Sequence, residues 1–403
     1  MKICYINLCN YGSTGHIVRQ LADMAKEKGH DVMVAYPESN KNKPAKDCDY
    51  LIESQRYNYI SGELSTFTGF DCCFAVSATR KLLRQLDIFQ PDIIHLHNIH
   101  GWYVNISMLF RYIKKHSIRV VWTLHDCWAF TGHCPHFQEN NCDKWKTGCH
   151  SCELHMNYPK SYLDNSRWMY AIKKNCFTGV DNMVIVTPSE WLAALVRQSF
   201  LGGYPVQVIN NGIDLSVFKP SDSDFRKRYH IENKKIVLGV ASQWNNKKGL
   251  DVFIELSKRL GDMYQVVLVG TSEKTDALLP GNIISIHRTN NQQELAEIYS
   301  AADVFVNPTR EDTFPTVNIE ALACGTTVVT FDVGGSPEIL DQACGCVVPK
   351  DDINALHNEI IYMDAKSVFD RENCLLRSKK YDAKGKFREY ILMYDNMGEQ
   401  SCP

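Results

Sequence analysis

Residues 307–338 read NPTREDTFPTVNIEALACGTTVVTFDVGGSPE, and the prediction of the fold rests first on this segment. The apolar residues 304–306 predict a strand before it, and Pro315 suits the first turn of a helix that we expect to stop at Gly325. Residues 327–331 predict a second strand. A strand, an acidic loop, a helix and another strand in this order are typical of a parallel α/β sheet.

This unit of strand, loop and helix predicts an anion site with carboxylates beside it. Thr316 and Val317 lie in the first helical turn, where backbone amides have no partner inside the helix and favour a phosphate. Asp312 precedes the helix and Glu320 lies on it, and carboxylates accept hydrogen bonds from sugar hydroxyls. These residues therefore favour a nucleotide sugar. The alternative is an acid pair that only complements the helix dipole.

The rest of the chain repeats the alternation of strands and helices. Strand patterns occupy residues 2–8, 31–36, 93–96, 120–124 and 183–187, and a second set occupies residues 236–240, 266–269, 283–286, 304–306 and 327–331. We therefore predict two tandem Rossmann-like, doubly wound α/β domains with an interdomain cleft and a C-terminal helix that returns to the first domain. The first domain comprises residues 1–205 with the tail 386–403, and the second comprises residues 206–385.

Polar residues follow the strands of both sets, at the edge where open α/β sheets bind ligands. Lys247 and Lys248 follow one strand of the second set, where two ammonium groups would neutralise a diphosphate. His125 follows a strand of the first set. Gly15 closes the loop GSTG at the start of a helix, where glycine lets the backbone approach a ligand. A solvated basic turn and a flexible capped turn are the alternatives for the lysines and for the loop.

Composition narrows the class of protein. The formal net charge of −2 over 403 residues gives no basic excess for nucleic acid. There is no run of eighteen apolar residues, and the N-terminus is too polar for a secretory signal. Sixteen cysteines favour a reducing compartment. We expect a cytoplasmic protein, with peripheral contact with the inner membrane through the basic segments 80–84 and 111–115 or, alternatively, ordinary solvated faces there.

Regular periodicity fails between residues 126 and 158, where cysteine, histidine and tryptophan gather. Cys134, Cys142, Cys149 and Cys152 have a spacing that suits a tetrahedral zinc site. Such a fully ligated site would be structural, with no open position for catalysis. A loop with free thiols is the alternative. We expect no cofactor to be required for catalysis.

Together these motifs resemble family-four retaining glycosyltransferases of the GT-B fold. The resemblance rests on Asp312-x(7)-Glu320, the loop GGSPE at residues 334–338, NGID at residues 211–214, Lys248-Gly249 and the loop at residues 12–15. The sequence HDCW at residues 125–128 is similar to a bacterial branch that builds capsular, exopolysaccharide or colanic-acid-type glycans. Asp312 stands where the family has glutamate, and Gln243 where it has arginine.

The resemblance implies roles for single residues. Lys248 would hold the donor diphosphate, Glu320 the ribose hydroxyls, and His125 would lie near the transferred sugar. We name His125, Asp312 and Lys248 as catalytic residues, and Gly15, Asn211, Gln243, Lys247, Thr316, Val317 and Glu320 as nucleotide-sugar-binding residues.

The expected function is transfer of a sugar, with retention of configuration, from a UDP- or GDP-sugar to a saccharide acceptor that is lipid-linked. No metal is expected in catalysis, because the D-x-D sequences at residues 47–49 and 222–224 lie in polar stretches that we interpret as surface. Two alternatives stay open: a nucleotide-sugar epimerase or hydrolase on the same fold, and a degenerate, non-catalytic protein that binds a nucleotide sugar.

Overall fold

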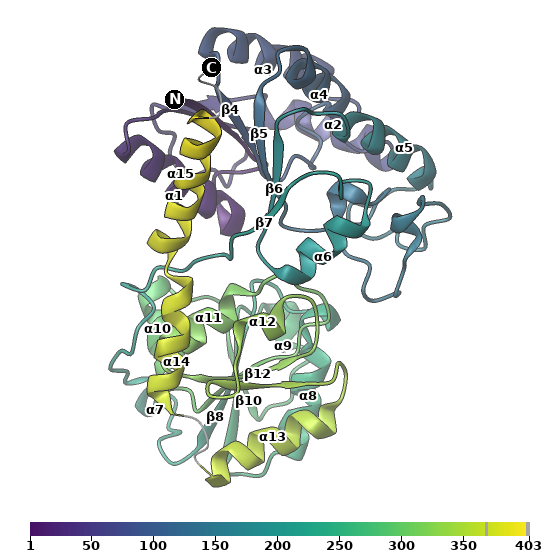
Figure 1. Ribbon diagram of the computed structural model, residues 1–403. Helices are drawn as coiled ribbons and strands as arrows, with labels where there is room; N and C mark the ends of the chain where they lie inside the picture. The colour runs from purple at the N-terminus through teal and green to yellow at the C-terminus, as the bar shows by residue number, and fades with distance from the viewer. Residues whose placement is uncertain (367–369, 400–403) are drawn as a thin grey trace. The chain divides into compact units, whose positions relative to one another are not determined.

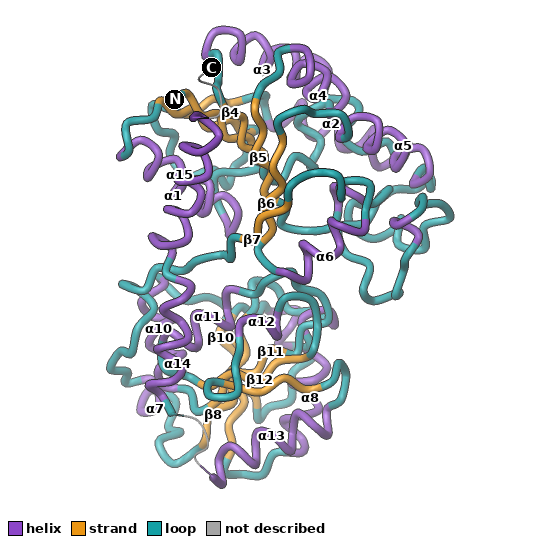
Figure 2. Tube along the Cα trace, viewed as in Figure 1, coloured by secondary structure: helices purple, strands orange, loops and turns teal. Residues whose placement is uncertain are grey.

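A computed structural model of the chain describes residues 1–366 and 370–399. It forms two compact units: Met1–Ile209 with the chain from Phe387 onward, and Asn210–Lys386. Figure 1 traces the chain, and Figure 2 shows strands enclosed by helices in each unit. The sequence prediction divides the chain after residues 205 and 385, whereas the units divide after Ile209 and Lys386. Residues 400–403 of the predicted tail lie outside the described residues.

The first unit contains a parallel sheet of seven strands in the order β3-β2-β1-β4-β5-β6-β7. The strands are β1 (Lys2–Ile6), β2 (Asp31–Tyr36), β3 (Asp49–Leu51), β4 (Ile93–Leu96), β5 (Arg119–Thr123), β6 (Met183–Thr187) and β7 (Val206–Val208). The strand order reverses between β1 and β4, which are paired from Ile3↔Ile93 to Ile6↔Leu96. Doubly wound sheets bind ligands at such a reversal, beyond the carboxyl ends of the strands.

With one exception, the helices of the first unit each bury an apolar stripe against this sheet. They are α1 (Gly12–Glu27), α2 (Gln55–Thr68), α3 (Val76–Phe89), α4 (Ile106–Lys115), α5 (Ser166–Phe177) and α6 (Glu190–Gln198). In α1 the buried residues Val18, Leu21, Ala22 and Ala25 recur at helical spacing, which explains why this segment folds as it does. Helix α2 departs from this rule.

The second unit contains a parallel sheet of six strands in the order β10-β9-β8-β11-β12-β13. They are β8 (Lys235–Val240), β9 (Tyr264–Val269), β10 (Ile283–Ile286), β11 (Val304–Asn307), β12 (Thr327–Phe331) and β13 (Gly345–Val348). Apolar side chains fill both faces: Ile236 and Leu238 belong to one core cluster and Val237 to another. This two-sided burial explains the continuous apolar runs in the sequence. The order reverses between β8 and β11, at the strands that precede the lysines and the acidic loop.

The helices of the second unit are α7 (Phe225–Arg228), α8 (Leu250–Arg259), α9 (Glu273–Asp276), α10 (Gln292–Ala301), α11 (Thr316–Ala323), α12 (Ser336–Ile339), α13 (Ile353–Lys366) and α14 (Arg371–Ser378). Helix α11 is the one expected at the acidic loop. Pro315 is its N-cap rather than its first residue, and Gly325 adopts a φ of +81° two residues beyond its end. That left-handed conformation suits glycine and stops the helix.

The C-terminal helix α15 (Ala383–Glu399) returns to the first unit, as predicted. Tyr390, Ile391, Met393 and Tyr394 are buried in this unit. The Tyr394 hydroxyl lies 2.6 Å from His95 Nδ1 of β4, and Thr123 Oγ1 of β5 donates to the Tyr390 hydroxyl at 3.2 Å. Tyr390 and Tyr394 of the tail therefore pack against the middle of the sheet.

The interpretation of the first D-x-D as surface holds for Asp47, which is exposed, and is wrong for Asp49. Asp49 lies on β3, and its side chain is only 2% exposed because it pairs with the guanidinium of Arg19. The Tyr36 hydroxyl also donates to Asp49, at 2.6 Å. Asp222 and Asp224 are exposed, as expected. Strand β3 has three residues, too few for a pattern to show, and its place in the sheet comes from parallel pairing with β2, from Val34↔Asp49 to Tyr36↔Leu51.

Candidate active site

Two lysines and two acids form the centre of the second unit's carboxyl edge. Lys247 and Lys248 lie on a 3-10 turn (Asn246–Lys248) after β8, and the acids lie in the loop after β11. Lys248 Nζ is 2.7 Å from Asp312 Oδ2, and Lys247 Nζ is 2.7 Å from Glu311 Oε2. The structure thus brings together three residues predicted for the site and adds Glu311, which the sequence showed only as a neighbour of Asp312.

The two ion pairs differ in burial. Lys248 and Asp312 are both partly exposed, whereas the Glu311 side chain is only 4% exposed. Exposed pairs are worth about 0 to 1 kcal/mol because water screens them. A diphosphate could therefore replace Asp312 beside Lys248 at little cost. Glu311 Oε2 carries the contact with Lys247, whereas Glu311 Oε1 is buried without a hydrogen-bond partner among the described residues.

Glu320 lies on α11 and is supported from the neighbouring helix. Tyr299 of α10 donates its hydroxyl to Glu320 Oε2 at 3.2 Å. Burial raises the pKa of the Glu320 carboxyl to about 7, while hydrogen bonds from Tyr299 and Thr316 act in the opposite direction. The carboxyl can thus change its charge near neutral pH. Sequence reasoning missed Tyr299, because nothing local marks a tyrosine as the partner of an acid twenty-one residues later.

Close backbone approaches shape the same loop. Gly334 follows β12 with a φ of +59°, and a Cβ at this position would lie 1.7 Å from the Asp312 carbonyl oxygen. The Gly334 loop therefore fixes the path of the loop that carries Asp312. Arg310 supports the loop from its other side, since its guanidinium reaches Asp251 at 2.8 Å and Asp351 at 2.6 Å. We did not identify Arg310 from the sequence.

For two predicted residues, Gln243 and Asn211, the described part of the chain shows no such contacts. Gln243 is exposed after β8, and Asn211 is half-buried at the start of the second unit. Beside Asn211, Gly212 packs closely on Ala383, to which an added Cβ would approach within 2.5 Å. The NGID segment therefore has a structural role where α15 begins. The roles of Gln243 and Asn211 in binding stay predictions.

The carboxyl edge of the first unit carries a histidine cluster. His125 follows β5 and His97 follows β4; their rings stack with centroids 5.3 Å apart, and His97 Nδ1 lies 3.0 Å from His125 Nε2. The His95 ring lies next to the His97 ring, tilted by 33° with the centroids 4.1 Å apart. The predicted catalytic histidine is thus one end of a row of three rings. Neighbouring parallel strands place them together, which the sequence indicated only by the polar residues after each strand.

Charges around this cluster are paired. His100 Nε2 lies 3.0 Å from Asp126 Oδ2, and both side chains are largely buried. Burial lowers the pKa of His100, but the Asp126 carboxylate outweighs it and raises the pKa overall. Burial raises the pKa of Asp126, but His100 holds it at about 2. His125, in contrast, is uncharged at neutral pH, because burial lowers its pKa to about 4.

Gly15 lies in α1 after the loop that follows β1. An added Cβ at Gly15 would lie 2.6 Å from the Asn10 carbonyl carbon and 3.0 Å from the Cys9 carbonyl oxygen. The glycine is therefore required by the protein's own backbone. Contact with a ligand diphosphate stays a prediction.

The cysteine-rich loop is packed, with Cys134 and the neighbouring Trp145 buried in the core. The Cys134 and Cys152 thiols share a hydrogen bond that acts on the pKa of both, and the Gly132 amide donates to Cys149 Sγ at 3.1 Å. Among residues 1–366 and 370–399, no group of three or more Cys, His, Asp or Glu side chains is arranged to hold a metal ion. Zinc binding by Cys134, Cys142, Cys149 and Cys152 stays a prediction that needs these side chains to turn.

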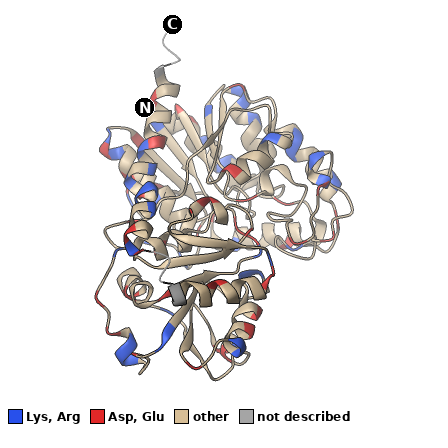
Figure 3. Ribbon diagram, turned by 60° about the horizontal axis from the view of Figure 1, so that its bottom comes forward, with Lys and Arg blue, Asp and Glu red and all other residues tan. Residues whose placement is uncertain are grey.

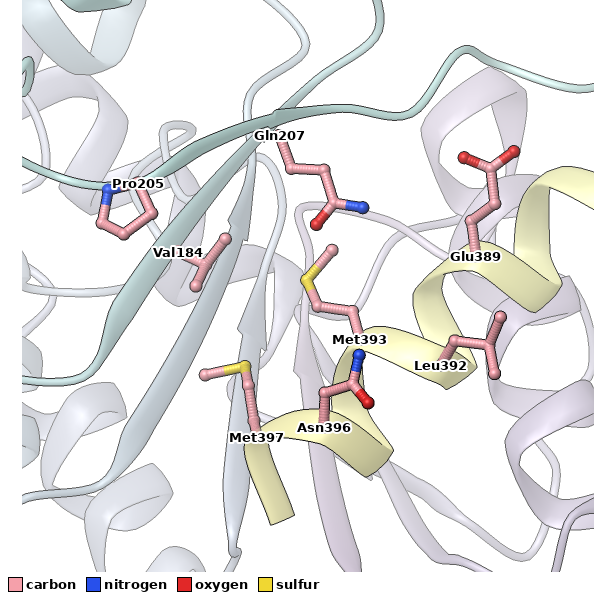
Figure 4. A pocket seen from close by; sticks show the side chains of 8 residues that line it. All are labelled: Val184, Pro205, Gln207, Glu389, Leu392, Met393, Asn396 and Met397. Carbon is pink, nitrogen blue, oxygen red and sulfur yellow. The ribbon is translucent and has the colours of Figure 1, made fainter. Parts of the chain in front are cut away.

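A pocket of about 450 Å³ lies away from these edges, between α15 and the strands β6 and β7. Figure 4 shows its lining, with Met393 of α15 pointing toward Gln207 of β7. Val184 lines it near the start of β6, whereas the predicted site residues follow the ends of strands. The pocket therefore does not belong to the candidate active site.

Comparison with known proteins identifies the family. The family model described as Glycosyltransferase Family 4 matches residues 14–217, about half of the chain, and the one described as Glycosyl transferases group 1 matches residues 234–364. The chain belongs to glycosyltransferase family 4. It is 25% identical over 319 residues to the putative colanic acid biosynthesis glycosyl transferase WcaC of Escherichia coli, covering 76% of this chain and 77% of that protein.

Solved structures show that this glycosyltransferase has the GT-B fold. The sucrose-phosphate synthase of Thermosynechococcus elongatus aligns over the whole of both chains with a TM-score of 0.73 and 18% identity. Anabaena HepE in complex with UDP and glucose aligns over 98% of this chain and all of its own, with a TM-score of 0.69 and 13% identity. The predictions of two Rossmann-like domains and of a glycosyltransferase are confirmed. In the described part of the chain no helix has the length and apolar character needed to span a membrane.

Proposed function

We propose that this glycosyltransferase moves a sugar from a UDP- or GDP-sugar to a saccharide acceptor with retention of the anomeric configuration. The observation that carries the proposal is the cluster of Lys247, Lys248, Glu311 and Asp312 at the carboxyl edge of β8 and β11. The similarity to HepE, whose structures contain UDP, supports a nucleotide-sugar donor.

In this proposal the second unit binds the donor. Lys248 and Lys247 stabilise the diphosphate, whose negative charge grows as the glycosidic bond breaks. The first-turn amides of Thr316 and Val317 add the positive end of the α11 dipole. Glu320 accepts hydrogen bonds from the ribose hydroxyls when its carboxyl is ionised. Asp312 holds Lys248 until the diphosphate arrives and then lies beside the sugar.

The first unit contributes the acceptor side. His125 can offer a neutral imidazole to a sugar hydroxyl, because burial keeps its pKa at about 4. His97 fixes the orientation of the His125 ring through the 3.0 Å contact. The acceptor hydroxyl forms its bond to the anomeric carbon on the face from which the diphosphate departs. The departing diphosphate oxygen takes the hydroxyl proton, so no enzymic base is needed.

We propose that the two lysines and the helix amides supply the charge that a metal ion provides in other transferases. Asp49 of the first D-x-D is already held by Arg19, which supports this view. The acceptor is proposed to be lipid-linked, in line with the polysaccharide named for the Escherichia coli relative. A structural zinc on the four cysteines, and peripheral contact with the cytoplasmic face of the inner membrane, complete the proposal.

The test is nucleotide release from UDP- and GDP-sugars, measured with and without a membrane extract as the source of acceptor. We expect release that depends on the acceptor and that falls in Lys248→Ala and Glu320→Ala. Leu278→Ser, an exposed position in the same unit, is the control and should release nucleotide as the wild type does.

Release without acceptor would instead indicate a hydrolase or an epimerase. Donor binding without release under any acceptor would indicate a degenerate binding protein. Retention is tested by the anomeric coupling constant of the purified product in proton NMR, and a product with inverted configuration would refute that part of the proposal.

A further inference from the structure

Helix α2 of the first unit has its apolar side turned outward. Its buried residues are the small ones, Ser61, Gly62 and Ser65. The large apolar residues Tyr59, Ile60, Leu64 and Phe67 are between 44% and 68% exposed. A surface helix normally shows the reverse arrangement, with its apolar stripe toward the core.

The orientation of α2 is fixed by close packing. A Cβ on Gly62 would lie 2.7 Å from the Trp102 ring, so only glycine lets the helix approach so closely. The Ser65 hydroxyl donates to the Ser61 carbonyl at 2.9 Å within the helix, which satisfies its polar group on the buried side. The helix cannot turn its apolar face inward without losing this contact with Trp102.

The apolar surface continues beyond α2. Tyr162 packs on Phe67 with ring centroids 5.4 Å apart, and the Tyr162 amide donates to the Thr66 carbonyl at 2.8 Å. Leu163 follows, and Trp168 on the first turn of α5 is 63% exposed. Lys160 lies over the Tyr162 ring at 4.8 Å. We call Tyr59, Ile60, Leu64, Phe67, Tyr162, Leu163 and Trp168 the α2 face.

The surrounding helices are strongly basic although the chain is not. Helices α2 to α5 carry ten lysines and arginines against two acids, while the formal net charge of the chain is −2. The cations are Arg56, Arg80, Lys81, Arg84, Arg111, Lys114, Lys115, Arg167, Lys173 and Lys174, and the acids are Glu63 and Asp87. Lys173 is buried, Lys81 pairs with Glu53 at 2.9 Å, and Lys114 donates to the Asn175 carbonyl at 3.1 Å. The other seven cations are exposed. Figure 3 colours these basic and acidic residues on the ribbon.

We propose that the α2 face inserts into the surface of an anionic phospholipid bilayer. Tyrosine and tryptophan are favoured at membrane interfaces because their rings are apolar with one polar end, and Lys and Arg around them bind anionic headgroups. A second copy of this chain fits less well, since its basic helices would repel the same helices of the first copy. The inference rests on the proposed function, because membrane binding would bring the enzyme to a lipid-linked acceptor. It adds the surface of the protein that makes this contact.

The experiment is flotation of the full-length protein with vesicles, without donor or acceptor. We expect the wild type to float with phosphatidylethanolamine–phosphatidylglycerol vesicles, to bind phosphatidylcholine vesicles poorly, and to dissociate as salt is raised. The triple variant Ile60→Ser/Leu64→Ser/Phe67→Ser should bind at least about tenfold more weakly, since burial of even one such side chain is worth about tenfold. The core should remain intact, because all three side chains are exposed.

A matched control replaces three equally exposed apolar residues of the second unit, Met263→Ser/Leu278→Ser/Leu376→Ser, and should float as the wild type does. The proposal is overturned if the wild type does not bind anionic vesicles, or if both triple variants bind alike. It is also overturned if the wild type is a dimer that only the α2 variant dissociates. Flotation measures membrane binding without catalytic turnover. Nucleotide release tests the proposed transferase activity separately, so that the failure of one proposal can be told from the failure of the other.

Discussion

The raised pKa of Glu320 predicts that donor affinity depends on pH. With a pKa of about 7 in the unliganded protein, the carboxyl is about one-tenth ionised at pH 6 and about nine-tenths ionised at pH 8. Only the ionised form accepts hydrogen bonds from both ribose hydroxyls. We therefore expect the affinity for a nucleotide sugar to rise about tenfold from pH 6 to pH 8, which corresponds to about 1.4 kcal/mol.

The assay is isothermal titration calorimetry of the donor sugar nucleotide at pH 6, 7 and 8, in two buffers with different ionisation enthalpies. A nucleotide sugar is the suitable ligand because its diphosphate is esterified at both ends and keeps its charge in this range. Binding near pH 7 should release a fraction of a proton. Glu320→Gln is the matched variant, since its amide cannot ionise, and its affinity should be lower at pH 8 and constant with pH.

The raised pKa of Glu320 also predicts that the free energy of unfolding depends on pH. The direction is opposite to that of donor affinity, because stability falls as pH rises. Glu320 has an ordinary pKa of 4.5 and a folded value of about 7, so the folded state holds the proton more tightly. This contribution to the free energy of unfolding is present below pH 4.5 and is lost as pH rises through 7. At 1.36 kcal/mol per pKa unit the loss amounts to about 3 kcal/mol relative to Glu320→Gln, measured by urea denaturation. Equal pH dependence in the two proteins, in binding and in stability, would refute the reasoning.

Three further outcomes are expected. Lys248→Ala should lower kcat about a hundredfold or more, because it removes one group that stabilises the charge of the departing diphosphate. The circular dichroism spectrum should stay unchanged. An unchanged kcat would show that Lys248 has no role in the reaction. Gly334→Ala should abolish nucleotide release, because its Cβ would collide with the Asp312 carbonyl, whereas Gly203→Ala, which has open space, should be silent. Plasma emission spectrometry should find about one zinc per chain, lost in Cys149→Ser, and a metal-free wild type would establish free thiols.

Sequence periodicity predicted ten of the thirteen strands in the described residues, because buried parallel strands have a local signature, and it did not predict β3, β7 and β13. Strands β2, β4, β6, β10 and β12 have the predicted ranges. Strand β1 ends at Ile6, two residues earlier than expected, and α1 begins at Gly12, so that the predicted loop at residues 12–15 is already part of the helix. Such boundaries depend on which backbone groups find partners, and the strand pattern does not contain that information.

The candidate site was predictable in part for the same reason. Polar residues after strand ends share one edge of a sheet, so Lys248 and Asp312 could be expected near each other, and they are paired at 2.7 Å. Their partners from other segments could not be expected. Tyr299 reaches Glu320 from another helix, and Arg19 holds Asp49 from thirty residues away, which turned an apparent surface D-x-D into a buried ion pair.

The amino-acid sequence was enough to predict the class of the protein: two α/β domains, the edges that carry their polar loops, and a family whose motifs lie in those loops. These features are local, because a strand's apolar run and a loop's composition are read within a few residues. The folded structure was needed to show which polar groups are paired, which carboxyl has a raised pKa and which face of α2 meets solvent. Those properties depend on burial and on neighbours that are distant in the chain. In α2, the sequence alone allows either the small residues or the aromatic residues to face the core, and the close contact of Gly62 with Trp102 fixes which side is buried.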